Sequence, residues 1–216
     1  MVRDIRRCRR CAEAPHGVPL PHDPRPVVRV SATARIAVVG QAPGTRVHAS
    51  GVPFTDPSGV RLRAWMGVSD AEFYDEARVA IIPMGFCFPG LDKAGGDLPP
   101  RAECAPLWRA RLFALLPQLE LVLLVGMYAQ RWHLGAECGR TLAETVQDYR
   151  RVLARPGRPH FFPLPHPSWR NNAWLKRNPW FESALLPELR GRVAALIHTD
   201  SNNKPADPLD GGRRKK

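Results

Sequence analysis

The sequence of 216 residues has no long apolar run, no internal repeat and few cysteines. No stretch reaches the roughly 20 apolar residues that a membrane-spanning helix needs, and the first residues contain no apolar signal region. We therefore expect a cytoplasmic protein, associated with the nucleoid, that has no membrane partner. The cysteines number five, an odd count that argues for free thiols or a metal site over structural disulfides.

Acidic residues are also scarce. The chain has 20 Asp and Glu against 32 Lys and Arg, a net charge of +12 and a pI of about 10.4. A basic surface attracts polyanions, and nucleic acid is the commonest of them. An arginine-rich composition that reflects genome bias is the alternative explanation, so charge alone does not decide the partner.

Apolar runs alternate with helical patterns along the chain. Strands are expected at 35–40, 78–84, 119–125 and 158–165, the last at an edge because prolines interrupt it. Helices are expected at 60–66, 69–77, 101–116, 126–133, 141–153 and 179–198, the first capped by Ser58. This order predicts an α/β fold, a three-layer α/β/α sandwich with a central, mainly parallel four-stranded sheet.

The ends of the chain differ from this pattern. Residues 14–33 are rich in proline and are expected to form an extended connector lying on the fold. Residues 199–216 are polar and basic, and we expect a disordered tail there. The predicted domain therefore comprises residues 1–198.

A tight turn follows the first strand and consists of Gly40, Gln41, Ala42, Pro43 and Gly44. Glycine permits positive φ and close backbone packing, while proline fixes its own φ. In open α/β sheets, ligands bind at the carboxyl ends of the strands, which is where this turn lies. An ordinary strand-to-loop connection is the alternative interpretation of the turn alone.

A second unusual turn follows the last strand. Its residues are Pro165, His166, Pro167, Ser168, Trp169, Arg170 and Asn171. Between the two turns, Gly51-Val52-Pro53-Phe54 forms a third motif. Together the three motifs, in this order and spacing, resemble the uracil-DNA glycosylase superfamily, and most of all its iron–sulfur branch, family 4.

The cysteines fit the same resemblance. Cys8-x-x-Cys11 lies among arginines and is weak evidence alone, but Cys87 after the second strand and Cys104 in the next helix complete the layout of family 4. The resemblance implies a structural [4Fe–4S] cluster on these four thiolates. Structural zinc with the same ligands and no metal at all are the alternatives. Cys138 is left as an unpaired thiol.

The resemblance also implies roles for the motif residues. Phe54 would stack on a flipped pyrimidine, and backbone N–H groups of the turn 40–44 would bind base oxygens. His166 would reach the base O2 and stabilise the charge that builds there as the base leaves. The alternatives are a core phenylalanine and a structural histidine.

The residues after His166 would contact the DNA backbone. Pro167, Ser168, Arg170 and Asn171 would grip the phosphates and enter the gap that the base leaves. Trp169 would stand at the tip of this wedge and stack on an exposed neighbour, unless it simply packs on the fold.

Two departures from the superfamily concern the chemistry. Ala42 stands where many members have an aspartate that positions the attacking water. Asp56 and His48 are the nearest polar candidates, with Gln41 in the turn itself, although Asp56 is equally well placed to cap the following helix. We count these three with His166 as catalytic candidates.

The second departure concerns base recognition. Superfamily members commonly read the pyrimidine edge with an asparagine after the second strand, but residues 83–87 contain none. Uracil must then be read by backbone groups or by another residue, and discrimination should be weaker. Phe86, or Phe88, is expected to complete an aromatic pocket for the base.

The leading interpretation is a monofunctional DNA glycosylase that hydrolyses the N-glycosidic bond of uracil, and of other deaminated bases, to initiate base excision repair. Its partner would be DNA that contains a damaged base, and it would act as a monomer. The first alternative is a non-catalytic Fe–S module that binds damaged or single-stranded DNA. A nucleoside or nucleotide hydrolase on a similar sheet is the second, against which the basic charge argues.

Overall fold

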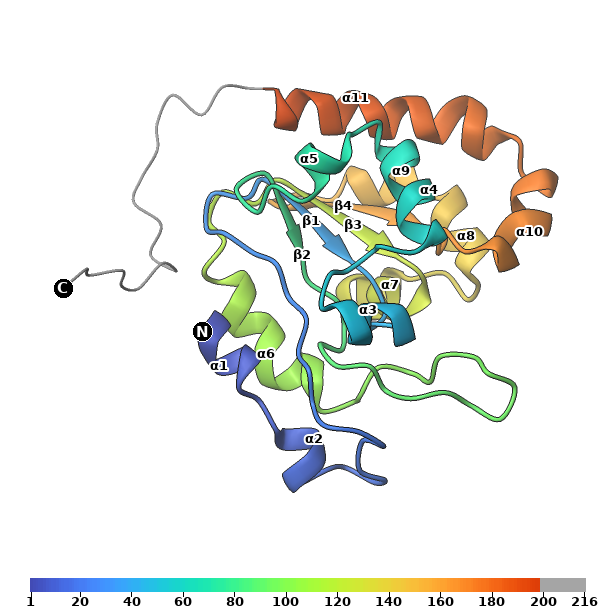
Figure 1. Ribbon diagram of the computed structural model, residues 1–216. Helices are drawn as coiled ribbons and strands as arrows, with labels where there is room; N and C mark the ends of the chain where they lie inside the picture. The colour runs from blue at the N-terminus through green and yellow to red at the C-terminus, as the bar shows by residue number, and fades with distance from the viewer. Residues whose placement is uncertain (199–216) are drawn as a thin grey trace.

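The structure is a computed structural model, and residues 1–198 are described. Its sheet contains β1 (Ile36–Val39), β2 (Val79–Ile81), β3 (Leu121–Val125) and β4 (His160–Leu164) in the order β2-β1-β3-β4. All neighbours pair in parallel. The expected three-layer α/β/α fold with a parallel four-stranded sheet is thereby confirmed (Figure 1).

Eleven α-helices occur in the described residues. They are α1 (Val2–Arg6), α2 (Arg10–Glu13), α3 (Thr45–Ser50), α4 (Pro57–Met66), α5 (Asp70–Phe73), α6 (Cys104–Phe113), α7 (Met127–Leu134), α8 (Leu142–Gln147), α9 (Tyr149–Leu153), α10 (Asn172–Arg177) and α11 (Leu186–Ile197). Short 3₁₀ segments cover Gly135–Glu137 and Trp169–Asn171, and a π-helical turn, Phe181–Leu185, precedes α11.

The strands are buried on both faces because their side chains alternate between two cores. Ile36 and Val38 belong to a cluster with residues of α4, α5, α8, α9 and α11. Ala37 and Val39 belong to a second cluster, with residues of α1, α6 and α7. Figure 1 shows these helix groups on opposite sides of the sheet. Continuous apolar runs such as β3 are the expected sequence of strands covered in this way.

Several boundaries differ from the sequence-based expectation. The first long helix begins at Pro57 and is capped by Asp56, not Ser58. The helix that follows Ser69 ends at Phe73, short of residue 77. Residues 141–153 form two helices, α8 and α9, which meet at Asp148. A short helix, α3, follows the first turn, where no helix is expected from the sequence. As expected, β4 is an edge strand.

The segment before β1 lies along the edge of the sheet. The N–H of Arg29 donates to Ile81 O at 3.1 Å, and Ile81 N–H donates back to Arg29 O at 2.7 Å in an antiparallel bridge. The expected extended connector therefore borders β2. No helix within residues 1–198 is both long and apolar enough to cross a bilayer. The tail predicted at 199–216 lies outside the described residues.

Candidate functional site

The turn 40–44 lies at the carboxyl end of β1 and is held by backbone hydrogen bonds. The N–H of Met84 donates to Gly40 O at 2.8 Å, and that of Gly85 donates to Gln41 O at 2.9 Å. The N–H groups of Gln41, Ala42 and Gly44 have no acceptor within residues 1–198. These free donors are available to a ligand at the edge of the sheet where ligands of such folds bind.

Phe54 lies against this turn. A Cβ atom on Gly40 would stand 3.4 Å from the tip of the Phe54 ring, so the strand end and the ring are in contact. The ring also meets Phe73 edge-on, at 5.9 Å between centroids. Phe54 is only partly buried and packs on the α4 side of the sheet. The structure thus brings the first turn and the expected stacking residue together.

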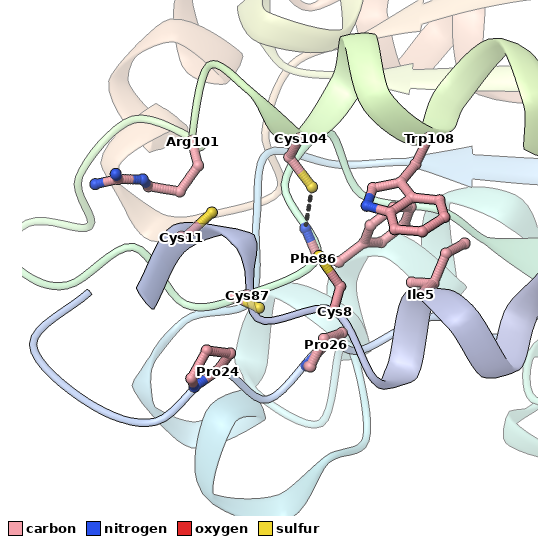
Figure 2. Close-up of a pocket in the computed structure, with 10 residues that line it drawn as sticks. All are labelled: Ile5, Cys8, Cys11, Pro24, Pro26, Phe86, Cys87, Arg101, Cys104 and Trp108. Atoms are coloured by element: carbon pink, nitrogen blue, oxygen red, sulfur yellow. Dashed lines mark hydrogen bonds between the residues drawn. The ribbon is translucent and has the colours of Figure 1, made fainter. Parts of the chain in front are cut away.

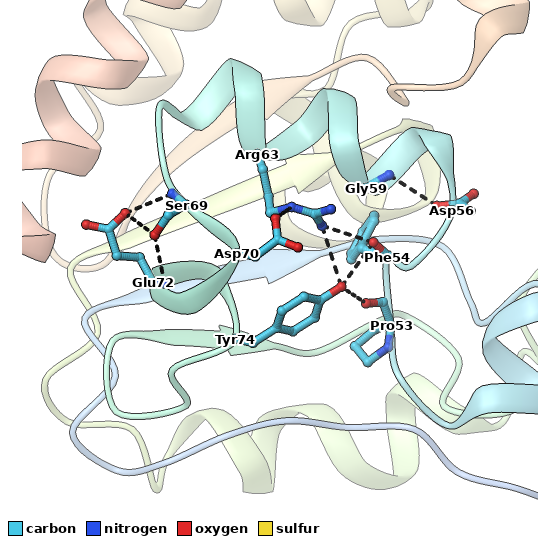
Figure 3. Close-up of polar contacts among 9 residues, drawn as sticks. All are labelled: Pro53, Phe54, Asp56, Gly59, Arg63, Ser69, Asp70, Glu72 and Tyr74. Carbon is cyan, nitrogen blue, oxygen red and sulfur yellow. Dashed lines mark hydrogen bonds and ion pairs between the residues drawn. The ribbon is translucent and has the colours of Figure 1, made fainter.

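The backbone of Phe54 has a left-handed conformation, with φ of 57°. Such a conformation costs a non-glycine residue about 1–3 kcal/mol and persists only where its surroundings enforce it. Here the Phe54 carbonyl accepts from Arg63 Nη1 and from the Tyr74 hydroxyl, both at 3.1 Å (Figure 3). Arg63 is itself paired with Asp70 at 2.6 Å. Two buried or half-buried donors therefore hold the backbone of Phe54, and with it the position of its ring.

Gly59 also holds the Phe54 backbone in place, and its contacts together with those of Arg63 and Tyr74 are here called the lock on Phe54. A Cβ at position 59 would lie 1.7 Å from the Phe54 carbonyl oxygen, so no side chain fits there. The Asp56 carboxylate accepts from Gly59 N–H at 3.1 Å and thereby caps α4 (Figure 3). The alternative role considered for Asp56, a helix cap, is the one that the structure shows.

The loop 165–171 follows β4 and is braced from two sides. Asn171 Nδ2 donates to His166 O at 2.6 Å, and Arg61 Nη1 donates to Ser168 O at 3.1 Å. The side chain of Trp169 is 73% exposed, with the Arg170 guanidinium over its ring at 5.9 Å. An exposed aromatic ring beside a cation, on a braced loop, suits contact with DNA.

His166 is held neutral at the base of this loop. Burial lowers the pKa of His166, opposed by the nearby Asp56 carboxylate and reinforced by the Arg170 guanidinium. Gly126, at the end of β3, lies beside it, since a Cβ there would stand 3.9 Å from His166 Cβ. A neutral imidazole can donate one hydrogen bond to a developing anion, which is the chemistry expected of it.

Two other candidates have different neighbours. The His48 ring packs at a tilt against His22, at 4.1 Å between centroids, and against Phe88, and the pKa of His48 is lowered by burial. Phe86 is 3% exposed in the core on the α6 side of the sheet, opposite the face on which Phe54 packs. The structure does not bring Phe86 to Phe54, and it groups His48 with His22 instead of His166.

The four cysteines of the expected cluster line one pocket, here called the cysteine pocket (Figure 2). Cys8 lies between α1 and α2, Cys11 in α2, Cys87 in the loop after β2 and Cys104 at the start of α6. Their sulfurs surround a common space. Cys138 lies outside it, with its sulfur 3.5 Å from the Thr145 hydroxyl.

The chemistry of the cysteine pocket suits a group that binds thiolates. Burial, then the neighbouring thiols, raises the pKa of Cys87 to about 12. Burial also raises the pKa of Cys104 to about 12, opposed by the Phe86 N–H, which donates to its sulfur at 3.4 Å. Arg109, only 2% exposed, adds positive charge near Cys104. A bound cationic group would offset the cost of four partly or fully buried thiolates.

Four thiols that line one pocket are a donor set for either metal group. A zinc site draws all four sulfurs onto one ion, whereas each thiolate of a [4Fe–4S] cluster binds a different iron. Within residues 1–198, no group of three or more His, Cys, Asp or Glu is arranged to hold a metal ion.

Several site residues carried no signal in the sequence. Backbone carbonyls of distant loops accept hydrogen bonds from Arg61, Arg63 and Tyr74. In the sequence, each of these three resembles an ordinary surface or core residue. Gln130 is fully buried and donates from Nε2 to Leu164 O at 2.9 Å, just before the loop 165–171. These contacts join segments far apart in the chain, which no local pattern reveals.

Comparison with known families covers most of the chain. The model of the uracil DNA glycosylase superfamily, whose members are generally glycosylases that act on DNA, matches residues 28–190. The matched segment contains both turns and Phe54, and it begins after Cys8 and Cys11. The chain therefore belongs to the uracil DNA glycosylase superfamily.

Proposed function

We propose that the protein is a monofunctional DNA glycosylase that removes uracil, and related deaminated bases, from DNA by hydrolysis. The observation that carries this proposal is the aromatic ring of Phe54, fixed against free backbone donors of the turn 40–44. A flipped base needs a flat face for stacking and donors at its edge, and this site offers both.

His166 supplies the second requirement, stabilisation of the leaving base. When the glycosidic bond breaks, its electron pair passes to the base and negative charge develops on the ring oxygens. A neutral imidazole donating to O2 stabilises that charge, and burial of His166 strengthens the effect. Asn171 and Arg61 support this function by holding the loop that carries the imidazole.

The same geometry accounts for base recognition without the asparagine. The backbone N–H groups of Met84 and Gly85 are used within the fold, and the donors left at this edge include those of the turn 40–44. Backbone donors recognise carbonyl oxygens, which uracil, hypoxanthine and xanthine all carry. We therefore expect broader base tolerance than a side-chain amide would give.

A [4Fe–4S] cluster is proposed for the cysteine pocket. When bound, it would supply structural cross-linking of three chain segments. Cys8 and Cys11 would tie the N-terminal helices to the loop after β2 and to α6. The reaction itself is assigned to residues at the carboxyl edge of the sheet, none of which is a cysteine.

The proposal is tested with labelled oligonucleotides that carry one uracil, hypoxanthine or xanthine, single- and double-stranded, followed by alkali cleavage of abasic sites. Cleavage at uracil supports the proposal in full. Cleavage only at a purine keeps the glycosylase and changes the base. DNA binding with no cleavage at any base would favour the alternative, a non-catalytic Fe–S module that recognises DNA.

A further inference from the structure

The proposed glycosylase reaction needs a group that orients and deprotonates water, and Ala42 has no polar side chain to do so. One oxygen of the Asp56 carboxylate is used to cap α4 through Gly59 N–H. The His48 ring packs at a tilt against His22 and Phe88. A carboxylate from another segment can fill this gap, and its assignment rests on the proposed glycosylase function.

A hairpin at residues 90–98 brings a further carboxylate to the edge of the sheet. Leu91 and Asp97 form an antiparallel bridge, and Leu98 N–H donates to Gly90 O at 3.0 Å. The Asp92 carboxylate accepts from the backbone N–H groups of residues 94 and 96, both at 2.8 Å. The bend of the hairpin is therefore fixed by its own side chain, and Asp97 has a defined place on the returning strand.

This hairpin is fastened to the first turn. Gln41 Nε2 donates to Leu98 O at 3.0 Å, directly after Asp97 in the chain. A Cβ atom on Gly44 would stand 3.3 Å from Asp97 Oδ2, so the carboxylate lies against the backbone of the turn at a position where glycine leaves room for it. Gln41, expected to be catalytic, thus positions the hairpin.

Asp97 and His166 share two charged neighbours. Although residue 97 as a whole is exposed, partial burial of its carboxylate raises the pKa of Asp97, opposed by Arg170 and reinforced by Asp56 and Asp92. The same Arg170 and Asp56 charges act on the pKa of His166. No hydrogen-bond donor from residues 1–198 contacts the Asp97 carboxylate, which leaves both oxygens free for water.

We propose that Asp97 is the general base that orients and deprotonates the attacking water. One water proton passes to a carboxylate oxygen of Asp97 while the water oxygen forms a bond to C1′ of the nucleotide. The bond between C1′ and the base nitrogen breaks, and its electron pair leaves with the base, stabilised by His166. The products are an abasic sugar, the base anion and protonated Asp97. Proton transfer from Asp97 to the base then gives the neutral base and restores the Asp97 carboxylate.

The test compares Asp97→Asn with the wild type in single-turnover cleavage of the preferred oligonucleotide. Loss of a general base should lower the rate by roughly 10²–10⁴-fold, while affinity for DNA stays within about threefold. The matched control is Lys93→Ala, an exposed residue of the same hairpin, which should keep the wild-type rate.

The pH dependence gives a readout that a structural role would not move. Wild-type activity should fall as the pH drops through the pKa of Asp97, above the ordinary value of 3.8. The residual activity of Asp97→Asn should lack that acid limb.

The outcomes separate the two proposals. Wild-type cleavage with an Asp97→Asn rate within a few-fold, or with only weaker DNA binding, overturns the role of Asp97 and leaves the glycosylase intact. A wild type that cleaves no substrate overturns both. A slow Asp97→Asn variant that binds DNA normally and has lost the acid limb supports the general base.

Discussion

The carboxyl edge of the sheet, with the turn 40–44 and Phe54, and the cysteine pocket lie at different places in the fold and are built by different means. At the edge, the groups that would meet the substrate are mainly backbone donors and one ring, fixed by side chains such as Arg63 and Tyr74 from neighbouring helices. In the cysteine pocket, the chemistry resides in the side chains, and backbone groups such as Phe86 N–H support them.

Because of this difference, substitutions in the two regions should affect different properties of the protein. Residues of the edge can be changed with loss of chemistry and little loss of folding, because most are partly exposed. Residues of the cysteine pocket join helices far apart in the chain, so changes there should affect stability and cofactor content first. Single substitutions in each region can test this separation, beginning with the largest effect.

Among the substitutions that test this separation, His166→Ala is expected to give the largest loss. Removing one preorganised donor to a developing oxyanion lowers turnover by roughly 10²–10³-fold. Single-turnover cleavage measures the change, and the colour and thermal midpoint should match those of the wild type. Activity within a few-fold of wild type would remove His166 from the mechanism.

Cys104→Ser should lower cofactor content and stability first. The purified wild type is expected to be brown, with broad absorbance near ~400 nm from iron–thiolate bonds, and the variant should lose this absorbance and unfold at lower temperature. Cys138→Ser is the matched control, because Cys138 lies outside the pocket, and it should keep the colour. A colourless wild type that binds zinc would contradict the cluster.

Gly59→Ala tests the lock on Phe54. Because the added Cβ would meet the Phe54 carbonyl at 1.7 Å, we expect destabilisation of about 1–3 kcal/mol and impaired cleavage. Gly191→Ala makes the same change in α11, where no atom lies within 4 Å, and should stabilise by about 0.5–1 kcal/mol. Denaturant unfolding gives both values, and equal effects would refute the lock.

Arg170→Ala should have the smallest effect. One lost phosphate contact weakens DNA binding about equally for all sequences and lowers the slope of log affinity against log salt by about 1. Titrations at several salt concentrations measure this slope. Arg3→Ala, on α1, should leave it unchanged, and equal slopes for both variants would exclude Arg170 from the DNA contact.

The sheet could be predicted from the sequence because each strand is a short apolar run buried on both faces. Helix ends are less predictable: Asp56, not Ser58, caps α4, and both residues are good caps. The short helix α3 gives no clear signal because residues 45–50 lack an apolar period. In all these cases local sequence leaves more than one structure open, and tertiary packing decides between them.

Within the site, the motifs identify which segments meet but not how they are held. The left-handed backbone of Phe54 and the hairpin that carries Asp97 depend on contacts with Arg63, Tyr74 and Gln41, which no spacing encodes. Sequence proximity alone suggests His48 and Phe86 as site residues. In the fold the His48 ring contacts His22 and Phe88, and Phe86 packs in the core on the α6 side of the sheet. The cysteine layout, in contrast, is visible because cysteine is rare and the spacing matches a known family.

The free N–H groups of the turn 40–44 also bear on how this protein can change. A specificity that resides in the backbone cannot be retuned by exchanging one side chain, since every residue except proline presents the same donor. New base preferences would require a turn of different length or shape, or a new side chain introduced from outside it. The hairpin at 90–98, which already reaches the turn through Gln41, is the segment from which such a side chain could evolve.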